Sequence, residues 1–225
     1  MAVTIGATTT ASGDPGSVTS YSFNHTCDTG TTCLVVVVCA QDSTTTDPPV
    51  SGITYNSVPL TKAHETSPIY GDSGDGQMVS IWYLLSPSTG SSLSVAITHT
   101  GKCTDTGAVA VNLLGTATSN VVDSFDETNQ IIGSTPLGPI VNPAASGAMC
   151  IAGIMHNNTV IGNLSVNTGT LIRNQDVGNV MSVAYNLNTG SSVSILWTNT
   201  AGYYSATTGV TFKPGATESA SISPS

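Results

Sequence analysis

The sequence predicts an all-β protein, an antiparallel β-sandwich or jelly roll that is built from two pseudo-repeated halves. Three observations predict this fold. Apolar residues alternate with polar ones or form short runs, and they almost nowhere recur at the i, i+3, i+4 spacing of a helix. Clusters of Gly, Pro, Asn, Asp, Ser and Thr separate the runs, as they do between strands. A third observation is a repeated stretch: "SIWYLLSPSTGSSLSVAIT" at 80–98 returns as "SVAYNLNTGSSVSILWT" at 182–198.

The expected strands are rich in Val and Thr, whose branched side chains suit a pleated, half-buried surface. The run "CLVVVVCA" is apolar throughout, so it should be a central strand that is covered on both faces. "ITYNSVPL" predicts two short strands around a tight turn at Asn56 and Ser57, and Gly90 and Gly190 supply positive φ in two hairpin turns. The predicted strands are Val18–Asn24, Cys33–Gln41, Gly52–Tyr55, Val58–Ala63, Met78–Ser86, Ser91–His99, Ala108–Leu114, Met149–His156, Thr170–Asn174, Val180–Leu187, Ser192–Thr198 and Gly209–Lys213.

The repeat extends beyond the doubled hairpin. "TTCLVVVVCAQDST" aligns with "GAMCIAGIMHNNT", which indicates a duplicated unit of four to five strands. We predict one β-sandwich domain at 1–215, with pseudo-repeats at about 18–115 and 145–215 and a polar C-terminal tail at 216–225. The halves should cover each other's apolar faces, as sheet packing requires, and two small barrels in tandem are the alternative. The joint at 116–147 contains apolar residues and three prolines, so it should be ordered.

The charge balance excludes some classes of partner. Charged residues make up 8% of the chain, against about 25% in an average protein, and the net charge is −9. The four cationic residues are scattered, so neither nucleic acid nor an anionic membrane surface is an expected partner. No apolar run approaches the roughly 18 residues of a membrane-spanning helix. The N-terminus lacks the pattern of a signal peptide, so we expect either a removed export signal or synthesis and assembly in a cytosol.

The chain has five cysteines, so at least one of them has no disulfide partner within it. Cys27 and Cys33 flank the turn-like "DTGTT", and a disulfide between them is one alternative, with two free thiols as the other. Cys39 and Cys150 lie inside apolar runs and should be small buried hydrophobic residues. No spacing of Cys and His matches a zinc site.

No catalytic residues can be assigned, and we expect that the protein is not an enzyme. The histidines lie in no hydrolase or metalloprotease motif, and His25, His99 and His156 read as hydrogen-bonded residues at strand ends. Glutamate is too rare to supply an evident catalytic carboxylate pair. The acidic cluster "DSFDE" at 123–127 of the joint, with Asp123, Asp126 and Glu127, reads as a solvated turn, with a cation site as the alternative.

Two features are candidates for ligand binding. Asp72 and Asp75 in the Gly-rich "YGDSGDG" are candidate calcium ligands, although their spacing does not follow the EF-hand pattern. No other cofactor is expected. Trp82 and Trp197 lie on predicted strands, where they either stack against a sugar ring or belong to the core. The apolar residues on both faces around Trp82 favour the core.

Three stretches carry a resemblance to a known family: "VSGITYNSVPLTKA", "VSIWYLLSPSTGSSLSVAIT" and "AVAVNLLG". They resemble a β-sandwich family, similar to concanavalin-like or jelly-roll sandwiches, whose members occur among bacteriophage virion structural proteins and bacterial surface proteins. The resemblance spans roughly residues 18–213, and Ser57 stands where the family usually has Gly. Its motifs describe β-architecture and carry no catalytic residues.

The resemblance implies a non-enzymatic virion structural protein. We expect a capsid decoration (cement) protein that stabilises the phage head, is made in the host cytoplasm and lies on the exterior of the particle. Its partners would be the major capsid protein or other virion proteins, and it would form a homo-oligomer. The alternatives are a tail or head fibre component and a secreted carbohydrate-binding or adhesion module.

Overall fold

The computed structural model describes residues 1–12, 18–42, 50–70, 76–130, 137–157, 164–177, 179–199 and 204–216. These residues form strands and turns without any helix, and every pair of strands is antiparallel. The all-β, antiparallel prediction is therefore confirmed. The tight turn at Asn56 and Ser57 is also confirmed, because both residues have positive φ, as a two-residue hairpin turn of this type requires. Gly90 has the expected positive φ of 82°. The φ of Gly190 is not positive, so the prediction is wrong there.

The first half forms two sheets. The strands of the inner sheet are arranged in the order β1–β10–β3–β8–β6, with β7 also paired to β8, and those of the outer sheet in the order β2–β9–β4–β5. The bounds are β1 Thr4–Ser12, β2 Val18–Thr26, β3 Thr31–Asp42, β4 Val50–Tyr55, β5 Val58–Pro59, β6 Thr61–Glu65, β7 Ile69–Tyr70, β8 Gly76–Leu85, β9 Ser92–Cys103 and β10 Asp105–Leu114.

The second half repeats this arrangement. Its inner sheet has the order β11–β19–β13–β16–β15, and its outer layer consists of the pairs β12–β17 and β14–β18. The bounds are β11 Val122–Gln130, β12 Ile140–Val141, β13 Met149–His156, β14 Leu164–Thr168, β15 Thr170–Asp176, β16 Val180–Leu187, β17 Val193–Ser194, β18 Leu196–Asn199 and β19 Ser205–Phe212.

The two halves agree in register as well as in strand order. Ser80 lies opposite Val38 on the neighbouring strand, and Ser182 lies opposite Ile154 at the equivalent place. A register shift follows Lys62 in β6, and an equivalent shift follows Leu171 in β15. Because a bulge is a specific local feature of a strand pair, its return at the same place supports the predicted duplication.

The repeats are longer than the sequence predicts. They run from Thr4 to Leu114 and from Val122 to Phe212, because β1 and β11 are equivalent first strands that the predicted limits of about 18–115 and 145–215 leave out. The acidic cluster at 123–127 belongs to β11 and is therefore not a solvated turn. Both strands lie at a sheet edge and are rich in Thr or acidic residues, so they lack the apolar alternation that marks the other strands.

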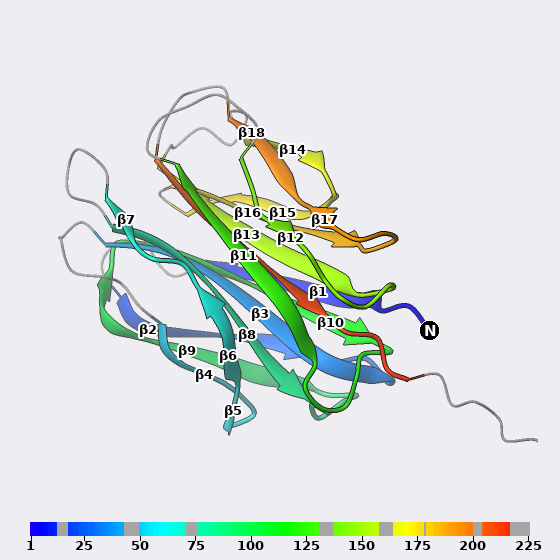
Figure 1. Cartoon of the computed structure of the whole chain (residues 1–225). Helices are drawn as coiled ribbons and strands as arrows, with labels where there is room; N and C mark the ends of the chain where they lie inside the picture. The colour runs from blue at the N-terminus through cyan, green and yellow to red at the C-terminus, as the bar shows by residue number, and fades with distance from the viewer. Residues whose placement is uncertain are drawn as a thin grey trace, which may run out of the picture.

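The molecule has four layers (Figure 1). Each half is a small sandwich with its own core, and the two inner sheets pack face to face around a third, larger cluster. Each half thus covers the other's apolar face as predicted, but it also forms a sandwich by itself.

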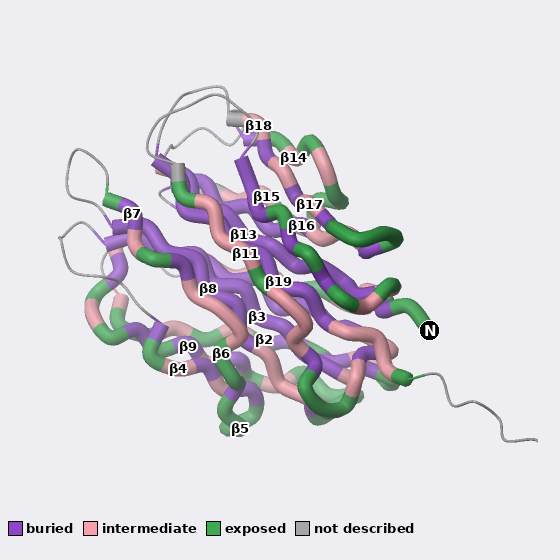
Figure 2. Tube along the Cα trace, viewed as in Figure 1, coloured by how far each residue is buried: buried purple, intermediate pink, exposed green. Residues whose placement is uncertain are grey.

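Strand β3 shows how one strand contributes to both the central cluster and an outer core. Val35 and Val37 point into the central cluster, while Leu34 and Val36 point into the outer core, so "CLVVVVCA" is covered on both faces (Figure 2).

Candidate functional site

Both tryptophans are core residues. The side chain of Trp82 on β8 is 6% exposed in the outer core of the first half, and Trp197 on β18 is 0% exposed in that of the second half. The indole Nε1 of Trp82 donates to Ser80 Oγ at 3.0 Å, and Nε1 of Trp197 donates to Ser182 Oγ at 2.9 Å. A sugar ring cannot stack on a buried indole, so the prediction of a ligand-stacking platform at these residues is wrong.

The two indoles reach equivalent serines from opposite layers. Trp82 belongs to an inner sheet, and its equivalent in the second half is Ala184, as the shared register shows. Trp197 belongs to the outer layer, and its equivalent in the first half by sequence is Ile97. The difference between the two copies therefore lies inside the cores and does not create a distinct outward face.

The cysteines are all free and buried thiols, so the structure contains no Cys27–Cys33 disulfide. Cys33 points into the central cluster between the two halves, whereas Cys27 belongs to the outer core on the other side of the sheet. Burial raises the pKa of the Cys33 thiol to about 12 and also raises the pKa of Cys39 and Cys150. These thiols are inert toward nucleophilic chemistry, and the prediction that Cys39 and Cys150 are buried is confirmed.

The calcium candidates Asp72 and Asp75 lie outside the described residues, so calcium binding there stays a prediction. Elsewhere, within the described ranges, no three His, Cys, Asp or Glu side chains come together in a group that could hold a metal ion.

His25 is the centre of a buried polar chain at the edge of the first half. Its Nε2 lies 2.8 Å from Asn112 Oδ1, and its Nδ1 lies 2.8 Å from Thr9 Oγ1. The amide Nδ2 of Asn112 donates to Thr26 O and to Asp28 Oδ2, so its Oδ1 is the acceptor and His25 Nε2 carries the proton. Burial lowers the pKa of His25. Both ring nitrogens of His25 are thus hydrogen-bonded, which agrees with the predicted role of this residue.

We expect Asn112→Ala to destabilise the protein by about 1–3 kcal/mol, because it leaves the buried His25 N–H without an acceptor. Chemical denaturation measures this loss. Ser94→Ala is a suitable control, since Ser94 is an exposed residue of β9 and should cost within about 0.5 kcal/mol. A loss for Asn112→Ala no larger than that of the control would contradict the assigned hydrogen-bond chain.

The broad outer face of the first half carries little charge and bears regular hydroxyl groups. Along β2 and β9 the outward residues pair in register, so that Ser20 faces Thr98, Asn24 faces Ser94 and Thr26 faces Ser92. Adjacent strands lie about 4.8 Å apart, and successive outward residues about 7 Å, so these groups form a repeating pattern. Lys102, near the end of β9, is the charged residue that β2, β4, β5 and β9 contribute.

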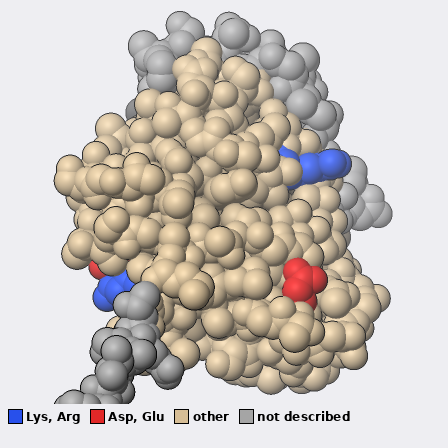
Figure 3. All heavy atoms as spheres, turned by 90° about the vertical axis from the view of Figure 1, so that its right-hand side faces the viewer, with Lys and Arg blue, Asp and Glu red and all other residues tan. Residues whose placement is uncertain are grey.

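Charged residues concentrate instead where β6 of the first half meets β11 of the second. The members on this edge are Lys62, Glu65, Asp123, Asp126, Glu127 and, just after β19, Lys213. The outer strands β12, β14, β17 and β18 of the second half contribute no charged residue. On the face of the molecule that Figure 3 shows, charged side chains are sparse. The layer faces are therefore suited to neutral partners, and the acidic edge is not.

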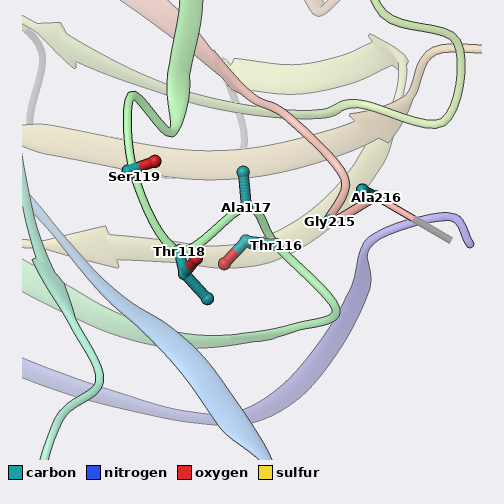
Figure 4. Close-up of a pocket in the computed structure, with 6 residues that line it drawn as sticks. All are labelled: Thr116, Ala117, Thr118, Ser119, Gly215 and Ala216. Atoms are coloured by element: carbon teal, nitrogen blue, oxygen red, sulfur yellow. The ribbon is translucent and has the colours of Figure 1, made fainter. Parts of the chain in front are cut away.

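A recess lies where the chain passes from the first half to the second. It is lined by Thr116, Ala117, Thr118, Ser119, Gly215 and Ala216 (Figure 4). None of these six residues is ionisable or aromatic. The recess can therefore offer hydroxyl and backbone hydrogen bonds, but it cannot supply an acid, a base or a stacking surface.

Neither protein-family models nor curated proteins match this chain. The described residues contain no helix long and apolar enough to cross a membrane.

Proposed function

We propose that the chain is a non-enzymatic structural protein of a virus particle, and specifically a capsid decoration protein on the exterior of a bacteriophage head. The observation that carries the proposal is the fused double sandwich, in which broad hydroxyl-bearing faces lie outside and apolar clusters join all four layers. The conserved elements of the two repeats are strand pairs, bulges and core residues. A rigid scaffold of this kind suits a protein that acts by binding and reinforcing a surface.

The distribution of charge supports a packed array of copies. At a net charge of −9, copies of the chain repel one another at long range. Contacts through the sparsely charged outer faces keep the acidic edge in solvent, so they avoid burial of unpaired carboxylates. We propose that the outer face of β2, β9 and β4 lies against the major capsid protein or a neighbouring copy, and that the protein forms a closed homo-oligomer.

Co-sedimentation tests this proposal. We expect the chain to be present, in a fixed ratio to the major capsid protein, in particles purified by density gradient from the host that produces it. Light scattering on the purified protein should give a discrete oligomer. Absence of the chain from purified particles would overturn the proposal.

A pair of charge variants tests which face makes the contact. Ser94→Lys places a cation in the middle of the outer face, whereas Thr61→Lys places one at an exposed position on the charged edge. We expect Ser94→Lys to reduce co-sedimentation with particles that lack the endogenous protein by more than tenfold and Thr61→Lys to leave it unchanged. Equal binding by both variants would contradict the assignment of the outer face.

A further inference from the structure

The edge strands of this protein differ in how they are protected against pairing with another chain. An edge strand presents unpaired N–H and C=O groups, and proteins protect it with charged residues, proline, a bulge or a very short length. Strand β6 carries Lys62 and Glu65 as well as a register shift, and β5 is two residues long and ends in Pro59. In the second half, β11 carries three acidic residues, and β15 has a register shift next to Arg173.

A junction at His64 adds to the protection of β6. His64 belongs to β6, and its Nδ1 lies 3.0 Å from Thr208 Oγ1 on β19 of the second half. Its ring stacks on Phe125 of β11 with 4.1 Å between centroids. This edge of the first half is therefore charged and also in contact with the second half.

On the opposite side of the first half, β1 is protected and β2 is not. Strand β1 has a register shift after Ile5, and the N–H of Ala7 there donates to Asp28 Oδ2 at 2.8 Å. The shift in β2 lies at its start, and Ser20–Thr26 then pair with β9 in unbroken register. Strand β2 contains no Asp, Glu, Lys, Arg or Pro. Among the edge strands in the part of the chain that the structure describes, β2 is thus the long one without a protective feature.

The hydrogen bonds of neighbouring residues show which backbone groups of β2 point away from its sheet. Ser94 of β9 lies opposite Asn24, but its carbonyl accepts from Asn56 N at 2.9 Å, at the end of β4. Ser94 therefore directs its backbone groups away from β2, and Asn24 directs its own away from β9. Because this direction alternates along antiparallel strands, the residues of β2 that share it are Ser20, Ser22 and Asn24. The residues between them bond β9 instead.

We propose that β2 pairs antiparallel with β2 of a second copy of this chain, across a two-fold axis at Ser22, so that the two outer sheets become one continuous sheet. The proposal rests on the homo-oligomer of the proposed function and names its interface. A strand that meets itself across a two-fold axis is self-complementary. In this register Ser22 exchanges two N–H···O=C bonds with its own counterpart, and Ser20 of each copy does so with Asn24 of the other.

The side chains of β2 fit this register. Tyr21 and Phe23 are partly buried and pack against the outer core of the first half. In the proposed pairing, Tyr21 of one copy lies opposite Phe23 of the other in a non-hydrogen-bonded pair, where cross-strand side chains come closest. Aromatic pairs of this kind stabilise antiparallel sheets. Charge favours the same edge: each copy has a net charge of −9, and β2 brings the copies together on the side away from the acidic β11.

Light scattering on the purified full chain tests the pairing. We expect a dimer or a larger oligomer with an even number of copies. Ser22→Pro removes an N–H that points away from β9, so the pairing with β9 loses no bond, whereas the bonds at the two-fold axis cannot form. We expect Ser22→Pro to raise the dissociation constant of this contact more than tenfold. Ser22→Ala is the matched control, because it keeps the N–H and should leave the constant unchanged.

The outcomes separate this proposal from the proposed function. A native chain that is monomeric or forms an odd-numbered oligomer would overturn the pairing, and so would a Ser22→Pro variant that associates as tightly as the native chain. Co-sedimentation with particles is a separate measurement. A monomer that still co-sediments would thus refute the pairing of β2 and leave the location on the phage head standing.

Amide hydrogen exchange by NMR provides a second measurement that does not depend on the folding of a variant. It compares the native chain at a low protein concentration, where the contact dissociates, with a high one. We expect the amides of Ser20, Ser22 and Asn24 to exchange several-fold more slowly at the high concentration. The amides of Tyr21 and Phe23 bond β9 in both states, so their exchange should change little. Equal rates at both concentrations for the first three amides would overturn the pairing.

Discussion

Replacing Trp197 by alanine is expected to lower the free energy of unfolding by about 3–5 kcal/mol, the largest loss that we expect from a single core truncation in this chain. The side chain is fully buried, and its indole N–H bonds Ser182 in the core of the second half. The substitution leaves a cavity between two layers. It also removes the N–H group that donates a hydrogen bond to Ser182 Oγ. Denaturation by urea measures the loss, and a value below about 1 kcal/mol would contradict the assigned packing.

The equivalent truncation in the first half is the matched comparison. Trp82→Ala should also be costly, because Trp82 is 6% exposed and bonds Ser80. The ammonium of Lys62 lies 5.0 Å from the centre of its ring, and this contact is lost as well. If the two halves unfold as one unit through their shared central cluster, both variants should give single transitions with the same dependence on urea.

The double variant Trp82→Ala with Ile97→Trp gives the first half the arrangement of the second. The new indole would enter the core from the outer layer, toward the serine that Trp82 now bonds. We expect it to recover part of the loss of Trp82→Ala. Addition of Val36→Ala should recover more, because the residue equivalent to Val36 in the second half is Ala152. A double variant that is less stable than Trp82→Ala would show that the two cores are not interchangeable.

The positions of these two tryptophans in the cores show what the sequence of this chain does not predict. The repeated turns and strand faces predict the hairpins and the duplication, because those features depend on local residue type and period. A strand with apolar residues on both faces does not reveal which layer each face meets. The sequence alone does not relate Trp82 to Trp197, and the strand register shows that their indoles bond equivalent serines.

The edge strands and the junction at His64 were missed for a related reason. Strand β11 has an acidic, solvent-facing sequence, and its place beside β6 depends on the packing of one half on the other. No local pattern connects His64 to Phe125 or Thr208, which lie far away in the sequence. The signal that the sequence offers is an aromatic residue among acidic ones, Phe125, whose side chain is 55% exposed in the structure.

The central strands β3 and β13 contain a second site where the halves differ in a complementary way. Val37 and Gly153 are equivalent by register, since Val37 lies opposite Ile81 and Gly153 lies opposite Val183, the residue equivalent to Ile81. They also touch: a Cβ on Gly153 would lie 2.7 Å from Val37 Cγ1 and 2.9 Å from Val79 Cγ1. Equivalent residues meet where a two-fold axis crosses an interface, so the halves pack with approximate two-fold symmetry.

Gly153→Val should therefore destabilise the protein by about 1–3 kcal/mol or more through overpacking. Val is the better strand former, so a substitution at an open position would have the opposite sign. The variant places branched side chains against each other at a contact between the two inner sheets. Thermal or urea unfolding measures the loss, and a stabilised variant would contradict the close packing of the inner sheets.

The exchange variant Val37→Gly with Gly153→Val separates crowding from other effects of the new side chain. It again places one Val opposite one Gly across the axis, with the Gly now in the first half and the Val in the second. We therefore expect it to recover much of the stability that Gly153→Val loses. Val37→Gly alone should be destabilising, because it leaves a hole beside Val79. Two valines would crowd this contact and two glycines would leave it empty. One Val and one Gly fill it, so the contact favours packing of a Val-bearing half on a Gly-bearing half. If the double variant shows only the sum of the single losses, the two positions are not coupled and the axis does not pass between them.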